Sequence, residues 1–401
     1  MQVASEPPKN NKFLALIFLF IASDIMCDNY IIGAFNHSPP LIELLLLFIM
    51  LSLQIIISPI QAGTSDLYGR RKSLLFSILF SLLSLVFVFL FDMKLFSFIP
   101  MLILINISKG IFGNTIPISW AAVGDLSGKN LRLSFAFATA AYATGYIGLV
   151  FFNKYLPNSI ATFILIILFS ATLFMCFFYF FDLKDIKTKE LHYLNPKFCP
   201  YIVREISLII ADLKDKAYQN LFTAYILWEI SIYVILILYA DFMNNNSAFI
   251  EVLMMIGFLL GVSTFSFSGH ISDSKMIRIG YVICVASLLP YFFFVFLFQN
   301  INIVLAGCYF FHAIGNALLS PTIFCLVGRG KADHEKGKIY GLVESADTIA
   351  FLIAIIFIMF YKYLQLQIIY LVSVSLITAL ISWIPYRRFE KLRGINPSVP
   401  Y

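Results

Sequence analysis

Apolar residues along this chain gather into long uninterrupted runs, and polar residues are concentrated in the short stretches between them. Crossing a hydrocarbon core about 30 Å thick takes roughly 20 apolar residues in an α-helix, because lipid cannot hydrogen-bond a bare backbone. Runs of this length therefore indicate membrane-spanning helices. Twelve are predicted, near residues 13–33, 41–62, 73–92, 97–121, 133–152, 160–181, 218–241, 249–268, 277–298, 302–327, 339–360 and 365–386.

One long polar segment divides these spans into two sets of six. It carries many charges with Pro196 and Pro200, and is interpreted as a linker that contains a short surface helix near 202–216. The other loops are short, so consecutive helices are expected to be antiparallel neighbours. The pattern predicts an all-α integral membrane protein with twelve transmembrane helices in two pseudo-symmetric six-helix bundles. The predicted parts are residues 1–181, the linker 182–217, and residues 218–401.

The composition and the placement of charge agree with a membrane protein. Of the 401 residues, 60% are hydrophobic and only 12% are charged. With the N-terminus placed in the cytosol, 24 Lys and Arg fall on the cytosolic side and 3 on the other, and Lys109 lies within a span. This positive-inside bias predicts a multi-pass protein of the cell (inner) membrane with both termini cytoplasmic. The net charge of +6 follows from that topology and gives no reason to expect nucleic-acid binding.

Two similar loops occupy corresponding positions in the two halves. Residues 62–72 read Ala-Gly-Thr-Ser-Asp-Leu-Tyr-Gly-Arg-Arg-Lys, and residues 269–275 read Gly-His-Ile-Ser-Asp-Ser-Lys. The fourth and tenth spans also correspond, because Lys109 and His312 each precede a Gly-Asn pair and a proline. Such internal symmetry is typical of transporters whose halves rock about a site near the membrane midplane.

The first loop resembles the signature between helices 2 and 3 of the major facilitator superfamily, G-x-L-a-D-R-x-G-R-[RK]. Ala62 replaces its first glycine and Leu67 its first arginine, and the second loop lacks the basic half. With twelve spans and a central linker, the resemblance covers nearly the whole chain and implies the fold of that superfamily. The residues assigned to this conformational loop motif are Ala62, Asp66, Gly69, Arg70, Arg71, Gly269 and Asp273.

The chemistry of the first loop can also be argued without the resemblance. The Asp66 carboxylate can accept hydrogen bonds from the amides of a helix N-terminus and pair with Arg70, making a latch that breaks and reforms as the halves rock. Positive-inside anchoring is a sufficient explanation for Arg71 and Lys72. Anchoring by positive charge does not explain why this loop also contains an acidic residue, Asp66, and a glycine, Gly69.

Ionisable residues inside the first half are functional candidates, because a charge at bilayer depth costs at least a few kcal/mol. Asp24 and Asp28 lie on one face of the first predicted helix, and Lys109 is their natural counter-ion. Two carboxylates this close are not expected to be ionised together in a low dielectric, a property that a proton site needs. The drug–proton exporter branch of the superfamily is similar, with an acid in helix 1 and a basic residue in helix 4. A static buried ion pair is the alternative.

The second half adds further candidates, among which the sequence does not choose. Glu229 lies mid-span, and Glu344 and Asp347 share one face of a predicted helix. His312 either titrates or is hydrogen-bonded to a backbone carbonyl. The predicted proton-coupling and substrate cavity comprises Asp24, Asp28, Lys109, Glu229, His312, Glu344 and Asp347. The aromatic pocket candidates are Tyr142, Tyr225, Trp228 and Tyr233.

These features predict a proton-coupled secondary transporter that works by alternating access. Residues 316–346 look like tetracycline-type exporters, which favours efflux of a hydrophobic or amphipathic compound, although residues 143–148 lack the proline that exporters usually carry there. A proton-driven importer of an amino acid, nucleoside or organic acid is the alternative, and a non-transporting membrane sensor is a third.

Several motifs that are typical of other protein classes are missing from the sequence. It has no G-x-x-x-x-G-K-[ST] loop, nucleophile elbow, zinc-helix motif or dinucleotide fingerprint, so neither an ATP-driven pump nor an enzyme is expected. No cofactor or metal is expected, and the proton gradient is the expected energy source. The expected partners are the lipid bilayer, protons and a small-molecule substrate, and the chain is expected to be a monomer.

Overall fold

The structure is a computed structural model. It describes residues 11–34, 40–127, 131–155, 158–179, 207, 209–242, 247–267, 271–297, 302–329, 335–364 and 368–393, and the regular structure in these ranges is helical. The long helices of the first half are α1 Asn11–Ala34, α2 Pro40–Tyr68, α3 Arg70–Asp92, α4 Phe98–Ile107, η2 Ser108–Phe112, α5 Ile116–Leu126, α6 Leu131–Tyr155 and α7 Asn158–Tyr179. Those of the second half are α9 Lys216–Phe242, α10 Ser247–Phe267, α11 Asp273–Leu297, α12 Asn302–Arg329, α13 Lys336–Tyr363 and α14 Ile368–Arg393.

The described helices make twelve long segments when α4, the π-helical turn η2 and α5 are counted as one interrupted span. The prediction of an all-helical fold with twelve segments is therefore confirmed. Within the described residues, six helices are long and apolar enough to cross a membrane on length and composition. Of the predicted linker, residues 209–214 are helical, within the region where a short surface helix is predicted.

The fourth predicted span, near 97–121, corresponds to Phe98–Leu126, and the structure shows that it is interrupted. The α-helix ends at Ile107, residues 108–112 form a single π-helical turn, and residues 113–115 are not helical before α5 begins. Pro117 lies in the first turn of α5, where a residue without a backbone N–H starts a helix rather than continuing one. The interruption places Lys109 inside the π-helical turn.

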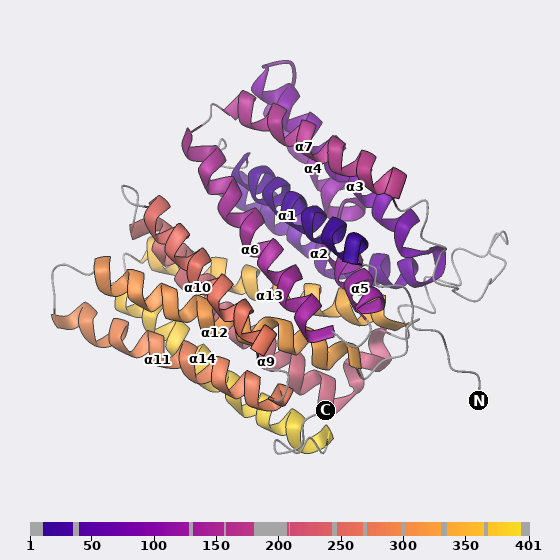
Figure 1. Cartoon of the computed structure of the whole chain (residues 1–401). Helices are drawn as coiled ribbons and strands as arrows, with labels where there is room; N and C mark the ends of the chain where they lie inside the picture. The colour runs from indigo at the N-terminus through magenta and orange to yellow at the C-terminus, as the bar shows by residue number, and fades with distance from the viewer. Residues whose placement is uncertain are drawn as a thin grey trace, which may run out of the picture.

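Figure 1 shows how the two halves are arranged. The first-half helices α1, α3, α4 and α7 lie on one side, and the second-half helices α9, α11, α12 and α14 lie on the other. Between them, α2 packs against α13, and α6 packs against α10 and α12. The end of the bundle where α2 passes into α3 at Gly69 is called here the Gly69 end.

Small residues on α13 allow its close packing on α2. Gly337, Gly341 and Ser345 follow one another at intervals of four and therefore share a face of the helix. A Cβ atom at Gly337 would overlap the carbonyl oxygen of Ala62, and one at Gly341 would overlap the backbone of α2. The Ser345 hydroxyl donates to the carbonyl oxygen of Ile55 at 2.8 Å. This small-xxx-small pattern brings the two backbones together across the boundary between the halves.

Candidate functional site

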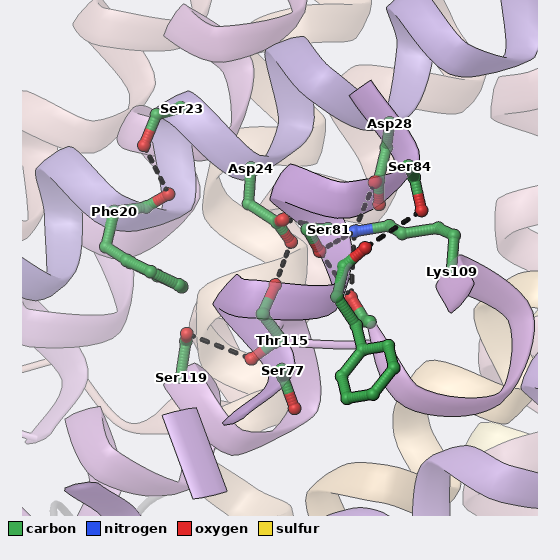
Figure 2. Close-up of polar contacts among 12 residues, drawn as sticks. Phe20, Ser23, Asp24, Asp28, Ser77, Ser81, Ser84, Lys109, Thr115 and Ser119 are labelled. Atoms are coloured by element: carbon green, nitrogen blue, oxygen red, sulfur yellow. Dashed lines mark hydrogen bonds and ion pairs between the residues drawn. The ribbon is translucent and has the colours of Figure 1, made fainter. Parts of the chain in front are cut away.

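A buried ion cluster joins α1 to the interrupted fourth span. The Lys109 Nζ atom lies 3.0 Å from Asp24 Oδ1 and 2.5 Å from Asp28 Oδ1, and Figure 2 shows it between the two carboxylates. Its hydrogen bonds go to Asp24 Oδ1, to Ser81 Oγ at 2.9 Å and to the Gly113 carbonyl oxygen at 2.8 Å. An ammonium has three N–H donors, which these four oxygen partners share. The Asp28 oxygen is the nearest of the four.

The two carboxylates of this cluster are in different environments. Asp24 is fully buried and accepts hydrogen bonds from Lys109 and from the Thr115 hydroxyl. The Asp28 side chain is 23% exposed and lines a central cavity, and its Oδ1 atom pairs with Lys109. A proton that arrives from the cavity reaches Asp28 before Asp24. If Asp28 becomes neutral, Asp24 still compensates the charge of Lys109.

The interruption of the fourth span supplies backbone acceptors to the cluster. The Gly113 carbonyl oxygen accepts from Ser81 Oγ at 2.9 Å as well as from Lys109. The Phe112 carbonyl oxygen accepts from Gln61 Nε2 at 2.7 Å. These carbonyls are available because the helix does not continue past them, and side chains of α2, α3 and α4–α5 take the place of the missing helical donors. Interrupted helices commonly serve as ion sites in transporters for this reason.

The central cavity lies between the halves and has a volume of ≈ 390 Å³. Binding sites for small molecules commonly span about 300–1,000 Å³. The ionisable lining residues are Asp28, Glu229, His312, Glu344 and Asp347. Asp24 and Lys109, the other two predicted members, lie outside the lining and in contact with Asp28.

The aromatic candidates divide between the cavity wall and the layer behind it. Tyr142, Tyr225 and Tyr233 line the cavity, and the Tyr233 hydroxyl donates to Asp347 Oδ2 at 2.7 Å. Trp228 is not among the lining residues. Its ring stacks on the His312 imidazole, with the ring centroids 6.0 Å apart and the planes at 10°.

His312 and Lys109 occupy corresponding positions in the two halves but have different environments. His312 is 5% exposed, and its Nδ1 atom lies 3.4 Å from the Ser287 hydroxyl. Its Nε2 atom has no hydrogen-bond partner within the part of the chain that the structure describes. A buried nitrogen without a partner is uncommon in a folded protein, which marks His312 as a candidate ligand contact at the cavity wall.

The loop at Gly69 connects α2 to the first turn of α13. Asp66 pairs with Arg70 and accepts hydrogen bonds from the backbone N–H groups of Gly337 at 3.1 Å and Lys338 at 3.4 Å. The amides at a helix N-terminus have no partner within the helix, and the helix dipole favours a carboxylate there. Gly69 has a φ of 89°, a left-handed conformation that favours glycine. Asp66 thus makes both contacts expected from the sequence, and its helix N-terminus belongs to the other half.

Arg70 extends this contact to a third helix of the first half. Its Nε atom lies 2.8 Å from Asp125 Oδ2 at the end of α5, and Lys336 Nζ lies 3.9 Å from Asp125 Oδ1. Ala62 is fully buried beneath the start of α13, and Arg71 lies in the first turn of α3. Asp66, Arg70 and Asp125 with the first turn of α13 are called the first latch.

A second latch lies at the corresponding place in the other half. Asp273 begins α11 and pairs with Arg132 at the start of α6 and with Arg329 at the end of α12. Arg132 also donates to the Ile271 carbonyl oxygen at 2.7 Å. The basic residues that the second loop lacks are therefore replaced by Arg132 from the opposite half and by Arg329. Gly269 lies outside the described residues.

Aromatic rings fill the space between the cavity and the two latches. Trp120 stacks on Phe324 with centroids 4.5 Å apart, and Phe135 lies 5.7 Å from Phe324 and 5.3 Å from Tyr340. Two of these rings come from each half. Trp120 and Phe324 also line the cavity, so this aromatic layer bounds it toward the Gly69 end.

Comparison with protein families identifies the fold. The family model described as "Major Facilitator Superfamily" matches residues 12–355, which is most of the chain. The chain belongs to the major facilitator superfamily. It is therefore a multi-pass membrane transporter rather than an enzyme, like the superfamily members of the same fold whose structures are solved.

Solved structures of superfamily members share this fold at low sequence identity. The human organic anion transporter MFSD10 (TETRAN) matches with a TM-score of 0.72 at 14% identity, over 96% of this chain and 100% of that chain. A bacterial homologue of the iron transporter ferroportin, in an outward-facing state with soaked iron, matches with a TM-score of 0.70 at 14% identity. That match covers 95% of this chain and 98% of the homologue. The transporter FucP in the outward conformation matches with a TM-score of 0.68 at 14% identity, over 94% of this chain and 98% of FucP. A search of the curated proteins found no match.

Several polar residues in the site of this superfamily member are not evident from motif or charge alone. Ser81 has a sequence signal, because Ser77, Ser81 and Ser84 repeat at helical spacing along an otherwise apolar span. Thr115 and Arg132 have none, since each is one of many similar residues near a predicted helix end. Only the packing of distant helices places Thr115 against Asp24 and Arg132 against Asp273.

The packing of Gly337 leads to a prediction about this superfamily member's conformation. Gly337→Ala should shift the protein away from the arrangement described here, because the added Cβ would overlap the Ala62 carbonyl oxygen. Overpacking of this kind costs about 1–3 kcal/mol, which corresponds to at least about a fivefold change in the ratio of conformations. The shift can be measured by electron–electron resonance between spin labels at Tyr68 and Lys275, in a variant whose native cysteines are replaced.

The matched control is Gly307→Ala, because nothing lies within 4 Å of a Cβ atom at Gly307. The distance distribution of this control should equal that of the wild type. For Gly337→Ala, longer distances across the Gly69 end should gain population. An unchanged distribution in Gly337→Ala would show that the close approach of α2 and α13 does not limit this conformation.

Proposed function

We propose that this protein is a proton-coupled secondary transporter that exports a hydrophobic or amphipathic compound by alternating access, as in the drug–proton exporter branch of its superfamily. The observation that carries the proposal is the position of Asp28. Its carboxylate faces the cavity, while the Lys109 ammonium beside it also bonds to Asp24, to Ser81 and to the Gly113 carbonyl oxygen. A group in that position can gain or lose a proton without exposing an unpaired lysine.

The proposed coupling follows from competition for Lys109. When Asp28 is ionised, both it and Asp24 attract the ammonium, and two negative charges share one positive charge. When Asp28 is protonated, the remaining Lys109–Asp24 pair is neutral, which is the cheaper state in a low dielectric. A cationic substrate in the cavity favours the ionised form of Asp28, and substrate and proton therefore exclude each other. Exchange of a proton for substrate follows from that exclusion.

We further propose that the Gly69 end faces the cytosol, with both chain termini on that side of the cell membrane. The bias of Lys and Arg toward the loops at this end supports the assignment. In this orientation the two latches and the aromatic layer separate the cavity from the cytosol, and the conformation is outward-facing. Opening toward the cytosol then requires that Asp66 leave the first turn of α13 and that Arg132 leave Asp273.

Export is favoured by the resemblance of residues 316–346 to tetracycline-type exporters. The direct test uses purified protein in liposomes with an imposed pH gradient, with ethidium as the amphipathic probe and alanine and uridine as nutrient probes. We expect ethidium to move against the proton flux, and the lumenal dye pyranine to report a matching pH change. A protonophore should abolish both signals.

The nutrient probes separate the alternatives in the same vesicles. Movement of alanine or uridine in the same direction as protons, without ethidium movement, would replace export by proton-driven import. Gradient-driven flux of none of the three probes, with correctly folded protein, would contradict the proposal. Protein-free liposomes with the same gradient are the control for leakage.

A further inference from the structure

The central cavity is unequal in charge between the two halves. The first half contributes one carboxylate to the lining, Asp28, which pairs with Lys109. The second half contributes Glu229, Glu344 and Asp347. Among the described lining residues there are no lysines or arginines. The second-half wall of the cavity therefore carries acidic groups for which the lining supplies no basic partner other than the His312 imidazole.

The three carboxylates lie on two helices that pack against each other. Glu229 projects from α9, and Glu344 and Asp347 project from α13, which packs against α9. Each glutamate lies within electrostatic range of Asp347 and of the other glutamate or Asp28. None of the three is in an ion pair among the described residues. A carboxylate at bilayer depth is costly unless a cation or hydrogen bonds offset it. The hydrogen-bond partners here are neutral: Tyr233 donates to Asp347 at 2.7 Å, Tyr225 lies against Glu229, and Trp120 lies against Glu344.

Aromatic rings surround these acids. Tyr142, Tyr225 and Tyr233 line the same cavity as the carboxylates, and Trp120 and Phe324 bound it toward the Gly69 end. The faces of aromatic rings attract cations, by about 2 kcal/mol or more where water is excluded. They also provide apolar area for the uncharged part of a ligand. Acids and ring faces in one cavity suit a charged group carried on an apolar body.

His312 adds a polar contact at the same wall. Its Nε2 atom is buried and has no partner within the described residues, although the side chain lines the cavity. The stacked ring of Trp228 holds the imidazole plane in place. A neutral imidazole nitrogen can accept a hydrogen bond from an ammonium N–H, which a sulfonate or carboxylate ligand cannot donate.

We propose that Glu229, Glu344 and Asp347 form a binding subsite for an organic cation, an amine or quaternary ammonium on an aromatic or apolar body. The proposal rests on the proposed transport function and names the substrate class of its cavity. It assigns the two halves different tasks: the first half holds the proton-exchanging cluster, and the second half recognises the charge of the substrate. An organic anion, the cargo in the name of one solved relative, would meet acids of its own sign here.

The test compares two probes of nearly equal size and opposite charge, tetraphenylphosphonium and tetraphenylborate. Their binding to the purified protein is measured by isothermal titration calorimetry without any gradient. We expect tetraphenylphosphonium to bind and tetraphenylborate to bind at least about tenfold more weakly. Glu229→Gln, Glu344→Gln and Asp347→Asn should each weaken tetraphenylphosphonium binding by about tenfold, which corresponds to ~1.4 kcal/mol.

Asp215→Asn is the matched control, because this carboxylate is 42% exposed, lies outside the cavity and can still cap α9 as asparagine. It should bind tetraphenylphosphonium as the wild type does. The neutralised variants remove repulsion between acids, so their melting temperatures should not fall, and an unchanged melting curve excludes loss of folding. Equal binding of the two probes, or unchanged tetraphenylphosphonium affinity in all three variants, would overturn the subsite.

The binding assay tests the cation subsite and the gradient assay tests the proton coupling, so the two proposals can be refuted separately. If tetraphenylphosphonium binds through the three acids but no pH gradient moves ethidium or a nutrient, the subsite stands and the proposed coupling fails. If a pH gradient drives a solute while tetraphenylphosphonium does not bind, the proton-coupled function stands and the cation subsite fails.

Discussion

Replacing Asp28 with asparagine should abolish pH-gradient-driven transport and leave the folded protein in the membrane. The asparagine amide keeps the shape of the side chain but cannot exchange a proton near neutral pH. Lys109 remains bonded to Asp24, Ser81 and the Gly113 carbonyl, so the cluster keeps a neutral ion pair. In liposomes, ethidium flux driven by a pH gradient should fall to the level of protein-free vesicles.

A second measurement distinguishes lost coupling from a damaged protein. Exchange of labelled for unlabelled ethidium across the membrane at equal pH needs no net proton movement, so Asp28→Asn should retain it. Asp92→Asn is the control substitution, because Asp92 lies at the far end of α3 and outside the cavity lining. Wild-type pH dependence in Asp28→Asn would refute the assignment of Asp28 as the proton carrier.

Replacing Lys109 with methionine should produce the largest loss of stability at this site. The change leaves Asp24 and Asp28 close together without a cation, and Asp24 is fully buried. Removing one partner of a buried ion pair commonly costs about 3–5 kcal/mol. Because proteins are stable by only about 5–15 kcal/mol, a clear fall in melting temperature is expected in detergent.

Charge rather than packing should account for that loss. The double variant Lys109→Met with Asp24→Asn removes one negative charge together with the positive one, so it should recover at least half of the lost melting temperature. Lys72→Met is the control, because Lys72 is exposed in the first turn of α3 and should melt as the wild type does. Equal destabilisation of the single and double variants would assign the effect to lost packing around the lysine stem.

The sequence pattern predicts the helices well because the bilayer constrains length and composition together. Each long helix of the described residues overlaps one of the predicted apolar runs, since any exposed backbone in lipid must be hydrogen-bonded within its own segment. The fourth span is the exception. Residues 107–116 contain Ser108, Lys109, Asn114 and Thr115 within a longer apolar run, and this fall in hydropathy is equally compatible with a continuous helix that carries a polar site. Pro117 and the glycines at positions 110 and 113 also fit an interruption, but such residues occur inside continuous membrane helices as well.

The candidate site, like the fold, could be predicted from the sequence only in part. The sequence marks Asp24, Asp28 and Lys109 because charges are rare in apolar runs, but it treats the two aspartates alike. The structure separates them, because burial depends on which helix covers each side chain. Asp24 faces Thr115 and the interior, whereas Asp28 reaches the cavity.

The partners of the two latches depend on contacts between residues that are far apart in the sequence. The sequence alone suggests that Asp66 pairs with Arg70 four residues away and caps a helix N-terminus. It does not identify that helix as α13, and it does not associate Asp273 with Arg132, which is more than a hundred residues away. These contacts follow from the close packing of α2 on α13 and of α6 on the second half.

By itself, the sequence determined the membrane environment, the two-part helical fold and the set of buried charges, because these depend on local composition and short periodicities. The tertiary structure decided which acid of the first half faces the cavity, where the fourth span breaks, and that three acids of the second half share a cavity lined by no lysine or arginine among the described residues. These outcomes depend on contacts between residues far apart in the chain. Local sequence patterns do not predict such contacts, because the interactions that stabilise them form only when the helices pack together.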